Sequence, residues 1–92
     1  MDVFADMAVK IIEHQEKIIG PVAVEQAQSI AGLTLDWVKK EASFTGEPKQ
    51  VLNELVSQYQ YLFGQISVEV CKEAIRGVMG QVSHDQLPEL LQ

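Results

Sequence analysis

Apolar residues recur at intervals of three and four along the first twenty positions, as they do on one face of an amphipathic α-helix. Asp2 precedes the pattern, and its short side chain can accept a hydrogen bond from the first turn. The sequence therefore predicts a helix from about residue 2 to residue 19. The apolar stripe consists of Phe4, Met7, Ala8, Ile11, Ile12, Ile18 and Ile19.

Gly20 and Pro21 end this predicted helix. Proline has no amide hydrogen to bond the Lys17 carbonyl, and its ring crowds the preceding turn. Glycine after one helix and proline at the first position of the next commonly separate two helices. A second helix is thus predicted from Pro21 to about Ala31.

Residues 32–46 allow two interpretations. Alternate residues from 33 to 37 are apolar, as in a strand, whereas Thr34 or Asp36 could cap a short helix that ends at Lys40. We expect the short helix.

From Pro48 to Val78 the apolar positions keep helical spacing and run across Gly64. The residues before and at Pro48 are typical of a helix start. A glycine inside a helix costs about 1 kcal/mol, and Gly64 has no proline beside it. Two alternatives therefore stay open. The segment is either one continuous helix or two helices separated by a break at Gly64.

A similar pattern occurs in both halves of the chain. Ile18–Glu25 is echoed 44 positions later by Leu62–Glu69. Aligning residues 7–31 with 51–75 gives three identities and eleven positions that are apolar in both copies. Any two amphipathic helices in phase share apolar positions, so this is weak evidence of duplication. It supports the narrower inference that both halves are helix–glycine–helix units.

These patterns predict an all-α fold, a small bundle of four to five helices in a single domain that spans residues 1–92. A domain of this size has a marginal core, yet 47% of its residues are hydrophobic. Small helical domains often cover such surplus apolar surface by association. We therefore expect a homodimer.

The net charge of −6 narrows the classes of partner that we expect for this chain. Nucleic acids and anionic membranes attract basic surfaces, and the only adjacent basic pair is Lys39-Lys40. We expect neither a nucleic acid nor a membrane as partner. The acidic first residues do not resemble a signal peptide, and the single cysteine, Cys71, fits a reducing compartment. These features predict a cytoplasmic protein.

Ile19-Gly20-Pro21-Val22-Ala23 resembles the I-G-P-[IV]-A segment of small helical modules attached to bacterial signalling and regulatory proteins. The resemblance implies an interaction or regulatory module without catalysis.

The residues that commonly carry chemistry do not form a recognisable pattern. His14 and His84 lack partners at metal-ligand spacing. Cys71 has mostly apolar neighbours in helical register, which disfavours the thiolate. Glu69 and Glu73 share a helix face, but a solvated acidic face offset by nearby cations explains them better. We predict no catalytic residue, cofactor site or metal site, and hence no enzyme.

Aromatic and leucine side chains are the candidate interaction residues. In a helix, Tyr59 and Phe63 share one face while Tyr61 points away, so one face can remain free for a partner. The C-terminal leucines have the spacing of a helical docking peptide, although a cap that folds back on the bundle explains them better. The predicted interaction residues are Trp37, Tyr59, Tyr61, Phe63, Leu90 and Leu91.

The leading functional hypothesis is a non-enzymatic, self-associating interaction or regulatory module. The alternative is a bundle that encloses a hydrophobic ligand or cofactor. Its predicted lining consists of Met7, Ile11, Tyr59, Phe63 and Met79.

Overall fold

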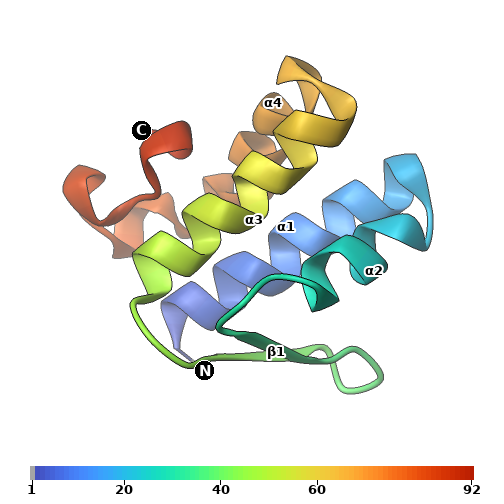
Figure 1. Ribbon diagram of the computed structural model, residues 1–92. Helices are drawn as coiled ribbons and strands as arrows, with labels where there is room; N and C mark the ends of the chain where they lie inside the picture. Colours follow the sequence, from blue (N-terminus) through green and yellow to red (C-terminus); the bar gives the residue numbers. More distant parts are fainter. Residues whose placement is uncertain (1) are drawn as a thin grey trace.

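Four α-helices, a β-hairpin and three short 3₁₀ turns make up the computed structural model, which describes residues 2–92 (Figure 1). Helices account for 69% of the chain, so the predicted helical character is confirmed. The fold is not all-α, however, because it contains a two-stranded antiparallel sheet. The elements are α1 (Val3–Ile19), α2 (Val22–Gln28), β1 (Leu33–Asp36), β2 (Glu41–Phe44), α3 (Pro48–Phe63), α4 (Gln65–Ile75), η1 (Arg76–Gln81), η2 (His84–Gln86) and η3 (Glu89–Leu91).

Helices α1 and α2 follow the predicted pattern. The Asp2 carboxylate caps α1 by accepting a hydrogen bond of 3.4 Å from the Phe4 amide. Gly20 ends α1 with φ 77° and ψ −159°, and its amide donates to the Glu16 carbonyl at 2.9 Å. The predicted break at Gly20-Pro21 is therefore confirmed.

Gly64 separates α3 from α4, which resolves the alternative between one long helix and two. Its dihedral angles, φ 85° and ψ −172°, nearly equal those of Gly20. Its amide donates to the Gln60 carbonyl at 2.8 Å, again four residues earlier. This region of backbone space is open almost only to glycine. The same turn thus ends the first helix of each unit.

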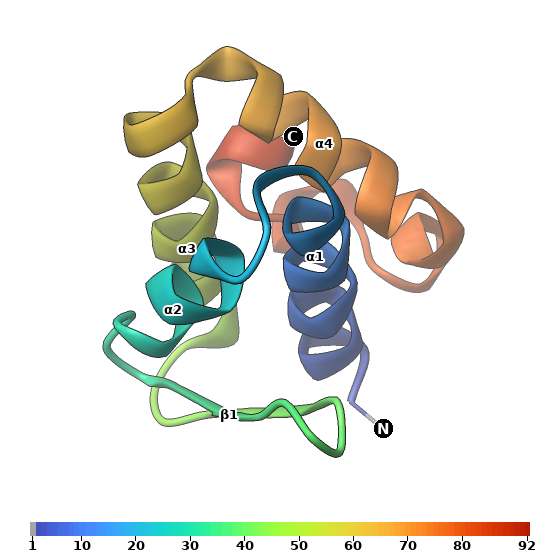
Figure 2. The same cartoon turned by 90° about the vertical axis from the view of Figure 1, so that its right-hand side faces the viewer.

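The prediction of a short helix between Thr34 and Lys40 is wrong, because these residues belong to the β-hairpin. Leu33 pairs with Phe44 and Leu35 with Ala42, which puts their side chains on one face of the sheet. This face packs against the core, with β1 against α2 and β2 against α1. In both views the hairpin crosses beneath the two helices (Figures 1 and 2). Burial of the apolar face outweighs the local capping signal.

The two helix–glycine–helix units are arranged as equivalent halves. Eight residues between positions 7 and 31 are buried, and seven of them have a buried counterpart 44 positions later. The pattern of buried positions thus shows that the two units correspond, which the three sequence identities alone did not establish. The seven pairs are Met7/Val51, Ala8/Leu52, Ile11/Leu55, Ile12/Val56, Gln15/Tyr59, Ala23/Ser67 and Ala27/Cys71.

The chain after α4 folds back over the helices. The turn η3 packs against α3 and α4, and Leu87, Pro88 and Leu91 are buried. The Leu90 amide donates to the Asn53 side-chain oxygen at 3.1 Å. The C-terminal leucines therefore cap the bundle, which is the role favoured for them over a docking peptide.

Candidate interaction surface

Two buried hydrogen bonds join the units in a reciprocal way. Gln15 Nε2 on α1 donates to the Ser67 carbonyl on α4 at 2.9 Å. Tyr59 Oη on α3 donates to the Ala23 carbonyl on α2 at 2.6 Å. Gln15 corresponds to Tyr59, and Ala23 corresponds to Ser67. Exchanging the two units converts one hydrogen bond into the other, which is the signature of an approximate twofold axis between them.

Cys71 lies beside this junction, with Sγ 3.4 Å from Gln15 Nε2. Burial raises the pKa of the thiol to about 11, and the hydrogen bond from Gln15 only partly opposes this effect. Burial, followed by the effects of Cys71 and Glu16, also raises the pKa of Tyr59 above its usual value. Both groups are therefore neutral at pH 7, and the apolar surroundings expected for Cys71 are confirmed, because the residue is buried.

The two glycine turns carry exposed aliphatic side chains, and we call this surface the turn patch. It consists of Ile18 and Val22 around the first turn and of Leu62 and Ile66 around the second. Ile18 is 64% exposed, Ile66 is 68% exposed and Leu62 is 42% exposed, while Val22 is half-buried. Ile18 was predicted to lie in the apolar stripe of the first helix, but it points away from the core.

The reciprocal hydrogen bonds bring the two parts of the turn patch to one end of the molecule. Ile18 is one helical turn beyond Gln15, and Ile66 directly precedes Ser67, to which Gln15 bonds. Both turns lie toward the right-hand side of Figure 1, the side that faces the viewer in Figure 2. Ile18 corresponds to Leu62, and Val22 corresponds to Ile66. The patch therefore contains each position twice.

Tyr61 lies on a different surface. Its side chain is 84% exposed, whereas Phe63 is half-buried and Tyr59 is fully buried. Tyr61 borders a hollow of about 530 Å³ between α3 and the residues that follow α2. Its lining mixes polar and apolar side chains and consists of Ser29, Ile30, Ala31, Glu54, Ser57, Gln58 and Tyr61.

Trp37 lies at the tip of the hairpin, where it is half-buried. Lys40 Nζ lies 3.7 Å from the centre of the indole ring, within cation–π range. The indole Nε1 is buried and has no hydrogen-bond partner within residues 2–92. Val38 beside it is 96% exposed. Trp37 thus contributes mainly to the packing of the tip.

Of the six predicted interaction residues, only Tyr61 is strongly exposed. Tyr59 and Leu91 are buried within the chain, and the other three are half-buried. The turn patch was missed because Ile18, Leu62 and Ile66 have the spacing of core residues. Their position next to glycines 20 and 64 is the signal that could have found them.

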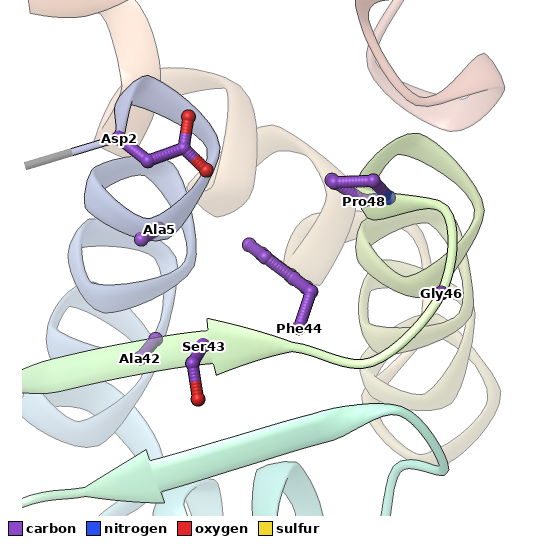
Figure 3. A pocket seen from close by; sticks show the side chains of 7 residues that line it. All are labelled: Asp2, Ala5, Ala42, Ser43, Phe44, Gly46 and Pro48. Carbon is purple, nitrogen blue, oxygen red and sulfur yellow. The ribbon is translucent and has the colours of Figure 1, made fainter.

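A second hollow, of about 310 Å³, lies between the start of α1, β2 and the start of α3 (Figure 3). Among residues 2–92, Asp2 is its only ionisable side chain, and this carboxylate already caps α1. Apolar and small side chains form most of its wall, so the hollow presents no group of reactive residues. Its lining is Asp2, Ala5, Ala42, Ser43, Phe44, Gly46 and Pro48.

The residues predicted to line a ligand site lie outside the best-formed surface hollows of the described chain. Met7, Ile11 and Tyr59 are fully buried in the packed core, and Met79 is 40% exposed. None of the five lines any of the four best-formed hollows among residues 2–92.

The acidic face of α4 carries ion pairs, as expected from its sequence. Glu69 pairs with Lys72 at 3.6 Å, and Glu73 pairs with Arg76 at 2.7 Å. His14 Nδ1 lies 3.0 Å from the Lys10 carbonyl in its own helix. Within residues 2–92, no three His, Cys, Asp or Glu side chains are placed to hold a metal ion.

None of the helices formed by residues 2–92 has the length and apolar character needed to cross a membrane. No protein-family model, curated protein or solved structure matches the chain.

Proposed function

We propose that this chain is a non-enzymatic helical interaction module that associates with a second copy of itself. The observation that carries the proposal is the exposure of Ile18, Leu62 and Ile66 at one end of a domain whose core is otherwise closed. Apolar surface of this kind commonly marks a protein contact, because covering it removes the cost of hydrating it.

Composition and charge support a protein as the partner. The chain combines 47% hydrophobic residues with a net charge of −6. An acidic chain is repelled by phosphate backbones, whereas aliphatic side chains gain from contact with other aliphatic side chains. The resemblance of residues 19–23 to modules of bacterial signalling proteins favours a regulatory setting, and the single cysteine favours a reducing compartment such as the cytoplasm.

Light scattering over a concentration series tests the proposal. The measured mass is expected to rise from the 10.2 kDa of one chain toward twice that value as concentration increases. A mass that stays at 10.2 kDa up to millimolar concentration would contradict self-association.

A further inference from the structure

We infer that the turn patch is the surface through which two copies associate, with the patch of one copy lying against the patch of the other. This inference rests on the proposed self-association and adds the place and geometry of the contact.

The symmetry of the patch favours a second copy as its occupant. A dimer with a twofold axis needs a surface that is complementary to itself. The turn patch suits such a contact because all four of its residues are aliphatic and occur as two equivalent pairs, one at each turn. A second copy rotated about an axis across the patch therefore presents aliphatic side chains to aliphatic side chains.

The charge distribution also fits a second copy. Neither the four patch residues nor Gly20, Pro21, Gly64 and Gln65 in the turns are ionisable, so the patch itself brings no like charges together when two copies meet there. Lys17 and Glu25 flank the first turn and are exposed, while Glu69, which corresponds to Glu25, flanks the second turn and pairs with Lys72. Within residues 2–92, neither Lys17 nor Glu25 belongs to one of the three ion pairs. These opposite charges at the edge can pair between two copies.

The other exposed apolar residues fit self-association less well. The hollow beside Tyr61 has polar as well as apolar walls and includes the carboxylate of Glu54. Val38 is isolated on the hairpin tip next to Lys39 and Lys40, and two copies meeting there would bring like charges together. Among the large exposed apolar residues of the described chain, Ile18, Leu62 and Ile66 form the one group that has no charged residue within it.

Sedimentation equilibrium of Ile66→Asp, compared with wild type, tests the inference. Burying an unpaired carboxylate in the contact is expected to weaken dimerisation about tenfold or more. Val38→Asp is the matched control, because it makes the same kind of change at a residue that is 96% exposed elsewhere. The control is expected to dimerise like wild type, and circular dichroism shows whether both variants keep their helices.

The salt dependence provides a second readout. Two copies with a charge of −6 each repel one another, and salt screens this repulsion. Wild-type dimerisation through an uncharged patch is therefore expected to strengthen between about 20 mM and about 500 mM salt. A contact made mainly by opposite charges would weaken over the same range, which would overturn the assignment.

The possible outcomes separate this inference from the proposed function. If wild type dimerises and Ile66→Asp dimerises equally well, the turn patch is not the contact, although self-association stands. If Val38→Asp alone loses dimerisation, the hairpin tip is the contact and the inference is wrong. If wild type remains monomeric, the proposed self-association itself is contradicted.

Discussion

Gln15 and Tyr59 show how two chemically different side chains serve equivalent positions. Each is buried and donates a hydrogen bond to a backbone carbonyl in the second helix of the opposite unit. A buried donor must find an acceptor, and a carbonyl in the facing helix satisfies both. A side-chain amide and a phenol can both donate to a backbone carbonyl. The equivalence of Gln15 and Tyr59 is therefore visible in the structure, although the two residues differ in sequence.

Replacing Tyr59 with phenylalanine removes the hydroxyl that bonds the Ala23 carbonyl. The ring still fills its place, so the variant is expected to lose about 1 kcal/mol of unfolding free energy, the usual net value of one internal hydrogen bond. Urea denaturation followed by circular dichroism measures the difference. Tyr61→Phe is the control, because Tyr61 is 84% exposed. Equal stability of both variants and wild type would contradict a role for the Tyr59 hydroxyl.

The buried Cys71 thiol predicts a loss of stability at alkaline pH. Its pKa rises from 9.0 to about 11 in the folded chain, mainly because of burial. Between these values the unfolded chain loses the thiol proton first, so unfolding becomes more favourable as pH rises. This difference in pKa corresponds to a loss of roughly 2–3 kcal/mol in the free energy of unfolding.

Urea denaturation at several pH values from 8 to about 11 measures this loss. The Cys71→Ala variant is expected to show a smaller decline, because only Tyr59, whose pKa is also raised, then contributes at the junction. An identical decline in the variant and in wild type would show that Cys71 is not responsible.

At the scale of elements, the two glycine turns set the architecture. Gly20 and Gly64 adopt nearly the same positive φ and extended ψ, and each reverses the chain so that a second helix packs beside the first. Pro21 reinforces only the first turn. The second turn relies on glycine alone, and Gly64 is therefore the more sensitive position.

Gly64→Ala is expected to destabilise the fold by about 1–3 kcal/mol, because an alanine at φ 85° is strained even where its methyl group has room. Gly80→Ala is the matched control, since an added methyl group there meets no atom within 4 Å and the backbone is not in the positive-φ region. Thermal unfolding measures both. Similar melting temperatures for the two variants would contradict the importance of the turn.

The sequence predicts the helices better than the hairpin. Helical spacing and the capping and breaking residues predict α1, α2 and α3 closely, because these signals are local. The hairpin depends on packing of its apolar face against α1 and α2, which contact it from other parts of the chain. The local signal at Thr34 was therefore misleading. The break at Gly64 was undecided for a similar reason, since no nearby proline enforces it.

The candidate surface was harder to predict than the fold. Ile18 and Ile66 have the spacing of core residues, yet both are exposed. They lie beside the glycine turns, at an end of the molecule that no other element covers in the described chain. Conversely, Tyr59 and Leu91 were predicted to contact partners but are buried. Tyr59 packs against α2, and Leu91 belongs to η3, which packs against α3 and α4. Exposure at a helix end depends on the neighbouring helix, which the local sequence does not specify.

At the scale of the whole molecule, two similar units are related by an approximate twofold axis. Their two glycine turns lie at the same end of the molecule and together form the turn patch. The junction that joins the units also fixes the relative position of their turns, because Gln15 and Tyr59 bond within one helical turn of Ile18 and Leu62. Within one chain, two equivalent units pack against each other. In the proposed dimer, two identical turn patches pack against each other in a similar way.

The most direct measurement of the proposed contact is a dilution series of ¹H–¹⁵N correlation spectra of the wild-type chain. We predict that the amide signals which shift with concentration belong to the two turns, around residues 17–25 and 61–69. Signals of the hairpin tip, and of Ser29 and Ser57 beside the Tyr61 hollow, are expected to stay in place. Shifts confined to the tip or to that hollow, with the turns unaffected, would contradict the account.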